Sequence, residues 1–299
     1  MLENSPARDG PPAVSWKLHR EVLLLAGWGR AILLQLAHPL VAEGVARHSE
    51  FLAGRMGWFH RLERTLRAML SLTFGTPEEV ARVARSINGI HDRVNGYLRE
   101  SGGGLPAGTR YSAHDPALLA WVHATLLDSF LLAYELFVAP LTGAERDRYC
   151  EESSSMGPLL GIPPGWLPRT APELRVYLAD ALSSGQIEVT ATARALSREI
   201  VNPPAPLIVR PLLALARWPA IGLLPPGIRA AYGFSWSPGQ ERALAALGAS
   251  CRRLIPFVPP AVRHWPAARA AEARERRAAG AVSSTFGIRR SDRGGCSGR

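Results

Sequence analysis

The stretch RLERTLRAMLSLTFGTPEEVARVARSINGIHDRVNG, residues 61–96, decides the fold. It predicts two helices joined by a turn at Gly75-Thr76-Pro77. Gly75 ends the first helix, Thr76 is a good N-cap residue, and Pro77 suits the first position of the second helix. Apolar residues then recur in steps of three and four, which places them on one helix face: Val80, Val83, Ala84, Ile87, Val94 and Leu98. The region is predicted to be an antiparallel helix pair.

Three polar residues share the apolar faces of this pair. His91 lies on the stripe of the second helix, between Ile87 and Val94, and Arg61 and Thr65 stand one turn apart on the first helix. An imidazole, a guanidinium and a hydroxyl directed into an apolar interior indicate a bound group. The spacing leaves an alternative open, in which His91 is an ordinary core histidine, Arg61 keeps its head in water and Thr65 fills space.

Length and composition favour a helical chain of one large domain or two modest ones, without structural disulfides. The chain has 299 residues, 47% of them hydrophobic, which is enough for a substantial core. It is rich in Ala, Leu and Arg, and no long run alternates with period two. The three cysteines, Cys150, Cys251 and Cys296, are far apart and include no C-x-x-C, so a disulfide framework and a zinc or iron–sulfur site are not expected.

The formal charge of +10 is concentrated at the C-terminal end. Residues 261–299 hold nine arginines against three acids, a net charge of +6. Such a tail can contact anionic lipid, and peripheral membrane contact remains open, but we favour a solvated end and expect no nucleic-acid partner. Residues 1–14 lack a basic region followed by an apolar one, so no signal peptide is predicted and the expected location is cytoplasmic.

Two further histidines are candidates for a site. His38 precedes Pro39, which bends the chain and makes His38 a candidate distal residue at a pocket rim, although a helix-terminal histidine bonded to backbone is the plainer interpretation. His123 lies on a long helix predicted from Asp115 to about Val138 and is a second ligand candidate. On that helix Asp128 needs donors if it is buried. His48-Ser49-Glu50 spells H-x-E without the partners of a metal site, so we interpret it as a polar helix end.

Several common chemistries are excluded by absent motifs. The sequence has no H-E-x-x-H, P-loop, G-x-G-x-x-G after a strand, G-x-S-x-G or C-x-x-C-H. No Glu stands three residues before any His, which removes the paired Glu-x-x-His motifs of di-iron bundles.

From Leu33 to Gly161 the chain resembles the oxygenase family that includes MpaB and rubber oxygenase (latex clearing protein). The resemblance rests on motifs in order: residues 33–51, Arg61-x-x-x-Thr65, Phe74–Pro77, Ile90-His91-x-x-Val94-x-Gly96, Tyr111-x-Ala113-x-Asp115-Pro116, Trp121–Ala124 with Asp128-Ser129, and Leu159–Pro163. It fades after about Ala181. Near Thr65 the chain departs from rubber oxygenase, because Arg64 stands where that enzyme has a lysine on the distal side.

The resemblance implies an all-α fold around a non-covalent haem b. His91 matches the proximal iron ligand, and Arg61 and Thr65 match residues at the haem pocket, with His38 and His123 as candidate catalytic residues. The implied activity is attack by O2 on a hydrophobic, unsaturated, isoprenoid-like small molecule or polymer, with an electron donor that the sequence does not identify. A non-catalytic haem carrier or sensor, and a haem-free helical binding protein with a basic tail, remain alternatives.

The predicted organisation has three parts. Residues 1–14 form a disordered lead-in, residues 15–260 a single helical domain, and residues 261–299 a basic helix followed by a disordered tail from about Gly280. Prolines in the C-terminal third predict short, interrupted helices there.

Overall fold

The computed structural model describes residues 13–48, 57–202 and 217–291, with side chains described in 13–48, 63–202 and 217–278. Within these residues the fold is all-α apart from one small sheet, as predicted. The predicted lead-in lies almost wholly outside them. The α-helices are α1 (Val14–His19), α2 (Leu25–Leu36), α3 (Pro39–His48), α4 (Gly57–Phe74), α5 (Pro77–His91), α6 (Pro116–Phe137), α7 (Gly143–Ser154), α8 (Ala171–Ser183), α9 (Ala191–Val201), α11 (Pro226–Ala231), α12 (Pro238–Leu254), α13 (Pro260–Arg263) and α14 (Pro266–Ser291). Short 3₁₀ turns are η1 (Val22–Leu24), η3 (Gly157–Leu160) and η5 (Ile255–Phe257).

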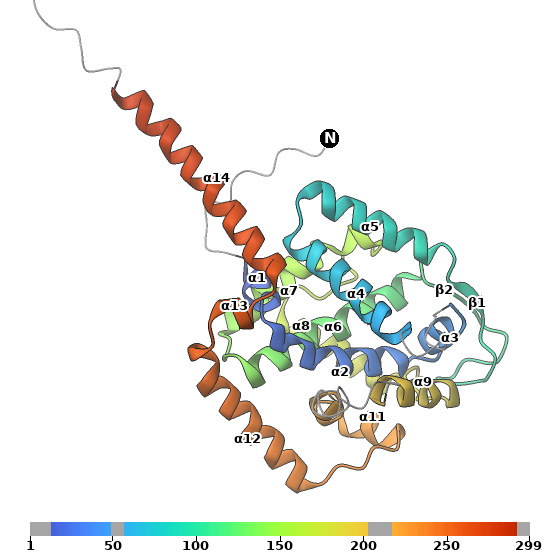
Figure 1. Ribbon diagram of the computed structural model, residues 1–299. Helices are drawn as coiled ribbons and strands as arrows, with labels where there is room; N and C mark the ends of the chain where they lie inside the picture. Colours follow the sequence, from blue (N-terminus) through green and yellow to red (C-terminus); the bar gives the residue numbers. More distant parts are fainter. Residues whose placement is uncertain (1–12, 49–56, 203–216, 292–299) are drawn as a thin grey trace, which may run out of the picture.

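Helix α6 runs through the middle of the molecule, surrounded by the other helices (Figure 1). Asp115 caps it by accepting a hydrogen bond from the Ala117 N–H at 2.9 Å, and Pro116 occupies its first turn, as predicted. By length and composition α6 is apolar enough to cross a membrane, and 61% of its apolar window is buried inside the fold. Burial by protein helices is the ordinary situation of a core helix.

Helix α2 packs closely along α6. Its Gly27 makes the approach possible, because a Cβ at that position would lie 2.6 Å from the Ser129 carbonyl oxygen on α6. The chain then bends by 106° between the α2 segment and α3, at His38-Pro39, where the sequence predicts a bend.

The predicted helix pair is present as α4 and α5, which pack against each other. Thr76 and Glu79 form a reciprocal capping box at the start of α5, with Pro77 in its first turn. Helix α5, the second of the pair, is shorter than its apolar stripe predicts. It ends at His91, and the chain continues into strand β1 (Asn95–Tyr97), which pairs antiparallel with β2 (Arg110–Ser112). Val94 therefore lies beyond the helix and packs on a small cluster around Tyr111.

The C-terminal third contains one helix longer than predicted. Pro238 lies in the first turn of α12, where proline is tolerated, and Ser237 caps this helix through Gln240. The 17-residue α12 packs on α6, and Arg252 donates to the Leu136 carbonyl at 2.6 Å. Residues 203–216, which include part of the predicted Pro-broken region, lie outside the described residues.

Helix α14 packs at its beginning on the end of α4 and then extends away from the body (Figure 1). Ala268 and Ala271 are buried against Phe74, and Arg274 donates to the Phe74 carbonyl at 2.7 Å. The helix continues past Gly280 to Ser291, and the disordered end of the predicted tail stays a prediction. No proline follows Pro266 to interrupt the Ala- and Arg-rich run.

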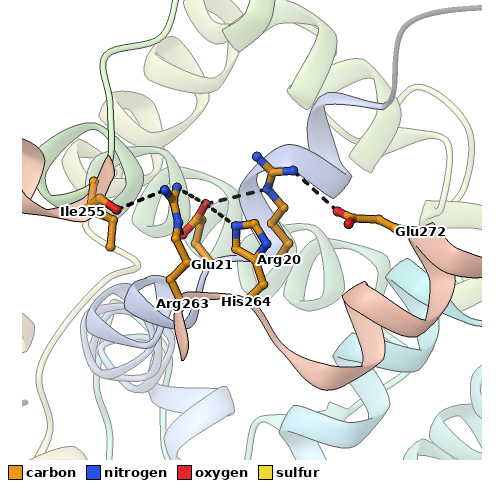
Figure 2. Close-up of polar contacts among 6 residues, drawn as sticks. All are labelled: Arg20, Glu21, Ile255, Arg263, His264 and Glu272. Carbon is orange, nitrogen blue, oxygen red and sulfur yellow. Dashed lines mark hydrogen bonds and ion pairs between the residues drawn. The ribbon is translucent and has the colours of Figure 1, made fainter. Parts of the chain in front are cut away.

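A buried carboxylate connects the N-terminal segment before η1 to the C-terminal segment around α13 (Figure 2). Glu21, only 1% exposed, accepts hydrogen bonds from Arg263 Nε at 3.0 Å and from His264 Nε2 at 3.2 Å. The Trp265 N–H donates to the Arg20 carbonyl at 3.0 Å beside it. This cluster attaches α13 and the start of α14 to the segment between α1 and η1.

Candidate functional site

The predicted site residue His91 is the last residue of α5, and its ring is half-buried. Its Nδ1 atom is buried and has no hydrogen-bond partner among the described residues. The His114 ring packs edge-on against it, with centroids 5.9 Å apart, and the Asp92 carboxylate holds His114 Nε2 at 2.7 Å. The pair of His114 and Asp92 thus lies beside the His91 ring. A buried, unpaired ring nitrogen calls for a partner.

The environment of His91 keeps its imidazole neutral. Burial lowers the pKa of His91 below 6.5, and the nearby His114 lowers it further, while Asp92 opposes both. A neutral imidazole is the form that binds iron, because protonation removes the donor lone pair. At neutral pH the side chain is therefore in the state that ligation requires.

The other two residues of the predicted pocket are on α4. Thr65 is exposed on this helix. The side chain of Arg61 lies outside the described residues, as does that of the first turn of α4. That Arg61, Thr65 and His91 share one bound group stays a prediction.

His38 precedes α3, and its side chain is buried at the bend between α2 and α3. Its Nδ1 accepts a hydrogen bond from the Leu40 N–H at 3.3 Å. Burial lowers the pKa of His38 to about 4. Capping explains this geometry without a ligand, and in the described chain no hydrogen bond, ion pair or ring contact joins His38 to His91. The distal role of His38 stays a prediction.

His123 projects from α6 into the interior, and its Nε2 is buried without a partner in the described chain. Hydrogen bonding to the Ser153 backbone opposes the larger effect of burial on the pKa of His123. Burial lowers the pKa of His123 to about 4. An imidazole with one nitrogen bound to backbone and a free lone pair on the other is also a suitable iron ligand.

His19 on α1 is a half-buried histidine that the sequence reasoning missed. Its Nδ1 lies 2.9 Å from the Thr73 hydroxyl and its Nε2 lies 2.8 Å from the Tyr149 hydroxyl. Because Thr73 donates its own proton to the Met69 carbonyl, it accepts from Nδ1–H, and Nε2 then accepts from Tyr149. Burial lowers the pKa of His19 to about 4, and the nearby His123 contributes. The partners of His19 are 54 and 130 residues away, so no local pattern indicated it.

The polar residues of α6 form a structural contact with α2. The Arg30 guanidinium lies 2.6 Å from the Asp128 carboxylate and donates to the Ser129 hydroxyl and to the Leu223 carbonyl, both at 2.7 Å. Asp128 is half-buried, and its carboxylate has the arginine partner that the sequence reasoning expected for a buried carboxylate. Each group in the cluster has its partner, so the cluster needs no ligand.

Metal sites made of clustered acidic, cysteine and histidine side chains are absent from the described ranges. His48 is exposed and its Nε2 lies 3.1 Å from the Asn95 carbonyl, while Glu50 of the same H-x-E lies outside the described residues. Cys150 is buried, and burial raises its thiol pKa to about 12. The contact of His48 fits the interpretation of this motif as a polar helix end.

A cleft of about 710 Å³ lies elsewhere, between α1, α7 and α14. Its walls carry both charges, including Lys17, Arg20, Glu145 and Glu272. Lys17 and Glu145 form an ion pair, as do Arg20 and Glu272. None of the predicted site residues lines this cleft, and its charged walls do not suit an apolar substrate.

Comparison with known proteins gives one match. Residues 16–253 match the family model described as "ER-bound oxygenase mpaB/B'/Rubber oxygenase, catalytic domain". No curated protein and no solved structure matches the chain significantly. The matched range contains His19, His38, Thr65, His91 and His123, and it ends before η5, α13 and α14.

Proposed function

Since the chain belongs to the MpaB/rubber oxygenase family and carries that family's oxygenase catalytic domain over residues 16–253, we propose that it is a haem b-dependent oxygenase. The proposed substrate is hydrophobic and unsaturated, an isoprenoid-like small molecule or polymer, and O2 is the co-substrate. The observation that supports haem most directly is the neutral His91, with a buried Nδ1 that has no partner in the described chain.

The residues at His91 fit the proposed group. A ring nitrogen that is unpaired and kept unprotonated is available to iron, and His91 is the residue that resembles the family's proximal ligand. Haem, when bound, supplies the iron centre at which O2 is activated. Arg61 is proposed to pair with a haem propionate, since guanidinium and carboxylate match in charge and geometry. Thr65 is proposed to line the same pocket from α4.

The neighbours of His91 are proposed to position it. Asp92 holds His114 by the 2.7 Å contact, and His114 packs against the edge of the His91 ring. This arrangement limits ring rotation, so the donor nitrogen keeps its direction whether or not the group is bound. Asp92 and His114 are therefore positioning residues, and neither is proposed to contact the substrate.

His123 is the competing ligand, because its Nε2 is equally unpaired and its imidazole equally neutral. We assign iron to His91 on the motif Ile90-His91-x-x-Val94-x-Gly96, and we keep His123, with His38, as a candidate catalytic residue. Haem-loaded protein from three variants decides between the two: His91→Ala, His123→Ala and, as a matched control, the exposed His48→Ala.

We expect His91→Ala to lose haem, measured as the Soret absorbance per mole of folded protein, while the other two variants retain it. Loss of haem in His123→Ala with retention in His91→Ala would transfer the ligand to His123. A wild-type spectrum without a Soret band would sink the haem proposal. Oxygen uptake by the wild type, with a reductant and an alkene, then separates an oxygenase from a carrier or sensor with the same haem.

A further inference from the structure

The corner Leu254–Val262, between α12 and α14, directs apolar side chains into the solvent. Phe257 is 83% exposed, Val262 68% and Leu254 64%. The prolines of the corner are exposed as well, and no charged residue interrupts it. Exposed apolar residues that occur singly are normal, but a contiguous run of them indicates an interaction surface.

This corner is held in shape from the inside (Figure 2). Ile255 is buried, with 7% of its surface exposed, and its carbonyl accepts a hydrogen bond from Arg263 Nη1 at 3.2 Å. The same guanidinium binds the buried Glu21 through Nε at 3.0 Å. One side chain thus ties both ends of the corner to each other and to the body, so the apolar residues are presented without an ordering cost on binding.

The surroundings of the corner are basic. From Arg242 to Ala271 the chain holds five arginines and no aspartate or glutamate, and the charge of one of them, Arg263, is offset by Glu21. Arg253 and Arg269 are exposed on either side of the corner, and within the described residues neither forms an ion pair. An apolar projection beside unpaired cations is complementary to a surface with negative charge outside and apolar material beneath, as in a bilayer with anionic lipids.

We propose that the Leu254–Val262 corner docks on a lipid bilayer containing anionic phospholipids. Phe257, Leu254 and Val262 enter the headgroup region, and Arg253 and Arg269 face lipid phosphates. The corner lies outside the matched catalytic domain, and the proposal is independent of haem. It differs from contact through the basic tail, because the apolar side chains of the corner supply the depth of insertion and the tail is not required.

Co-sedimentation of the full-length protein with vesicles tests the proposal. Vesicles of phosphatidylcholine with phosphatidylglycerol are compared with pure phosphatidylcholine, at low and high salt. The test variant is Leu254→Ser with Phe257→Ser, which changes no charge at two exposed positions. The matched control is Val176→Ser, a 60% exposed apolar residue on α8. A third variant replaces Arg289, Arg290 and Arg293 by Gln to neutralise the tail.

We expect the wild type to bind the anionic vesicles and to be released by salt. The corner variant should bind tenfold more weakly or worse, while Val176→Ser and the tail variant bind within about twofold of the wild type. Equal binding of the corner variant and the wild type overturns the proposal, as does loss of binding in the tail variant alone. A wild-type dimer in solution that the corner variant converts to monomer would assign the corner to a second copy of the chain and also overturn it.

Discussion

Replacing Glu21 by alanine tests the buried cluster that attaches the C-terminal helices to the body. Glu21 is 1% exposed and accepts from Arg263 Nε at 3.0 Å and Nη2 at 2.5 Å, and from His264 at 3.2 Å. Its removal leaves the Arg263 guanidinium, whose side chain is 17% exposed, without a carboxylate. Loss of one partner from a buried ion pair costs about 3–5 kcal/mol.

The lower end of that range applies here. In Glu21→Ala the Arg263 guanidinium keeps its hydrogen bond to the Ile255 carbonyl and its partial contact with solvent. We therefore expect the free energy of unfolding to fall by about 3 kcal/mol. The control is Glu272→Ala, because Glu272 contacts Arg20 at 3.5 Å and is 28% exposed. A contact of that kind contributes about 0–1 kcal/mol.

Urea unfolding followed by circular dichroism at pH 7 measures both variants, and limited proteolysis reports whether residues 254–266 become accessible. The double variant Glu21→Leu with Arg263→Met removes both charges, and should recover much of the lost stability because no unpaired ion remains. A Glu21→Ala protein within about 1 kcal/mol of the wild type, with unchanged proteolysis, would refute this account of the cluster.

Two further predictions concern stability. Burial lowers the pKa values of His19, His38 and His123 to about 4, against 6.5 for the ordinary imidazole. Between pH 6.5 and pH 4 the unfolded chain therefore binds more protons than the folded protein, so the free energy of unfolding falls as the pH drops through that range. The loss should reach about 2 kcal/mol for each histidine by pH 5, and equal urea midpoints at pH 7 and pH 5 would contradict it. Gly27→Ala should cost about 1–3 kcal/mol, because its Cβ would meet the Ser129 carbonyl at 2.6 Å. Gly89→Ala on α5, where no atom lies within 4 Å of the added Cβ, should instead stabilise by up to about 1 kcal/mol. A raised melting temperature for Gly27→Ala would contradict the first expectation, and a lowered one for Gly89→Ala the second.

Helix beginnings were predictable because their signals are local. Thr76-Pro77 and Asp115-Pro116 each place a capping side chain next to a proline that accepts the first helical position, and both helices begin there. The end of α5 was not predictable from the apolar stripe. The pairing of Asn95–Tyr97 with Arg110–Ser112 takes the chain out of the helix after His91, and this pairing is a tertiary effect that overrides periodicity.

Residues of the site were likewise predictable where their signals are local and not where their contacts are distant in sequence. His91 and His123 were selected by motif and position, and both carry a buried ring nitrogen without a partner in the described chain. His19 and the Glu21–Arg263 cluster were not predicted, because their contacts join residues up to 243 positions apart. Glu21 by itself is an ordinary acidic residue near a helix end. Only the fold brings Arg263 and His264 to it and makes its charge a buried one.

The apolar character of α6 has a consequence for biosynthesis. A segment that is apolar enough to cross a bilayer risks misinsertion or aggregation while it emerges from the ribosome. Helix α2, which packs along α6, is translated before it: Arg30 on α2 precedes its partner Ser129 on α6 by 99 residues. The order of elements along the chain thus shields α6 as it appears, whereas α12, another of its neighbours, arrives much later. A variant that lacks residues 1–36, and with them α2, should consequently misinsert or aggregate during synthesis. The failure should occur before the stability of the finished fold has any effect.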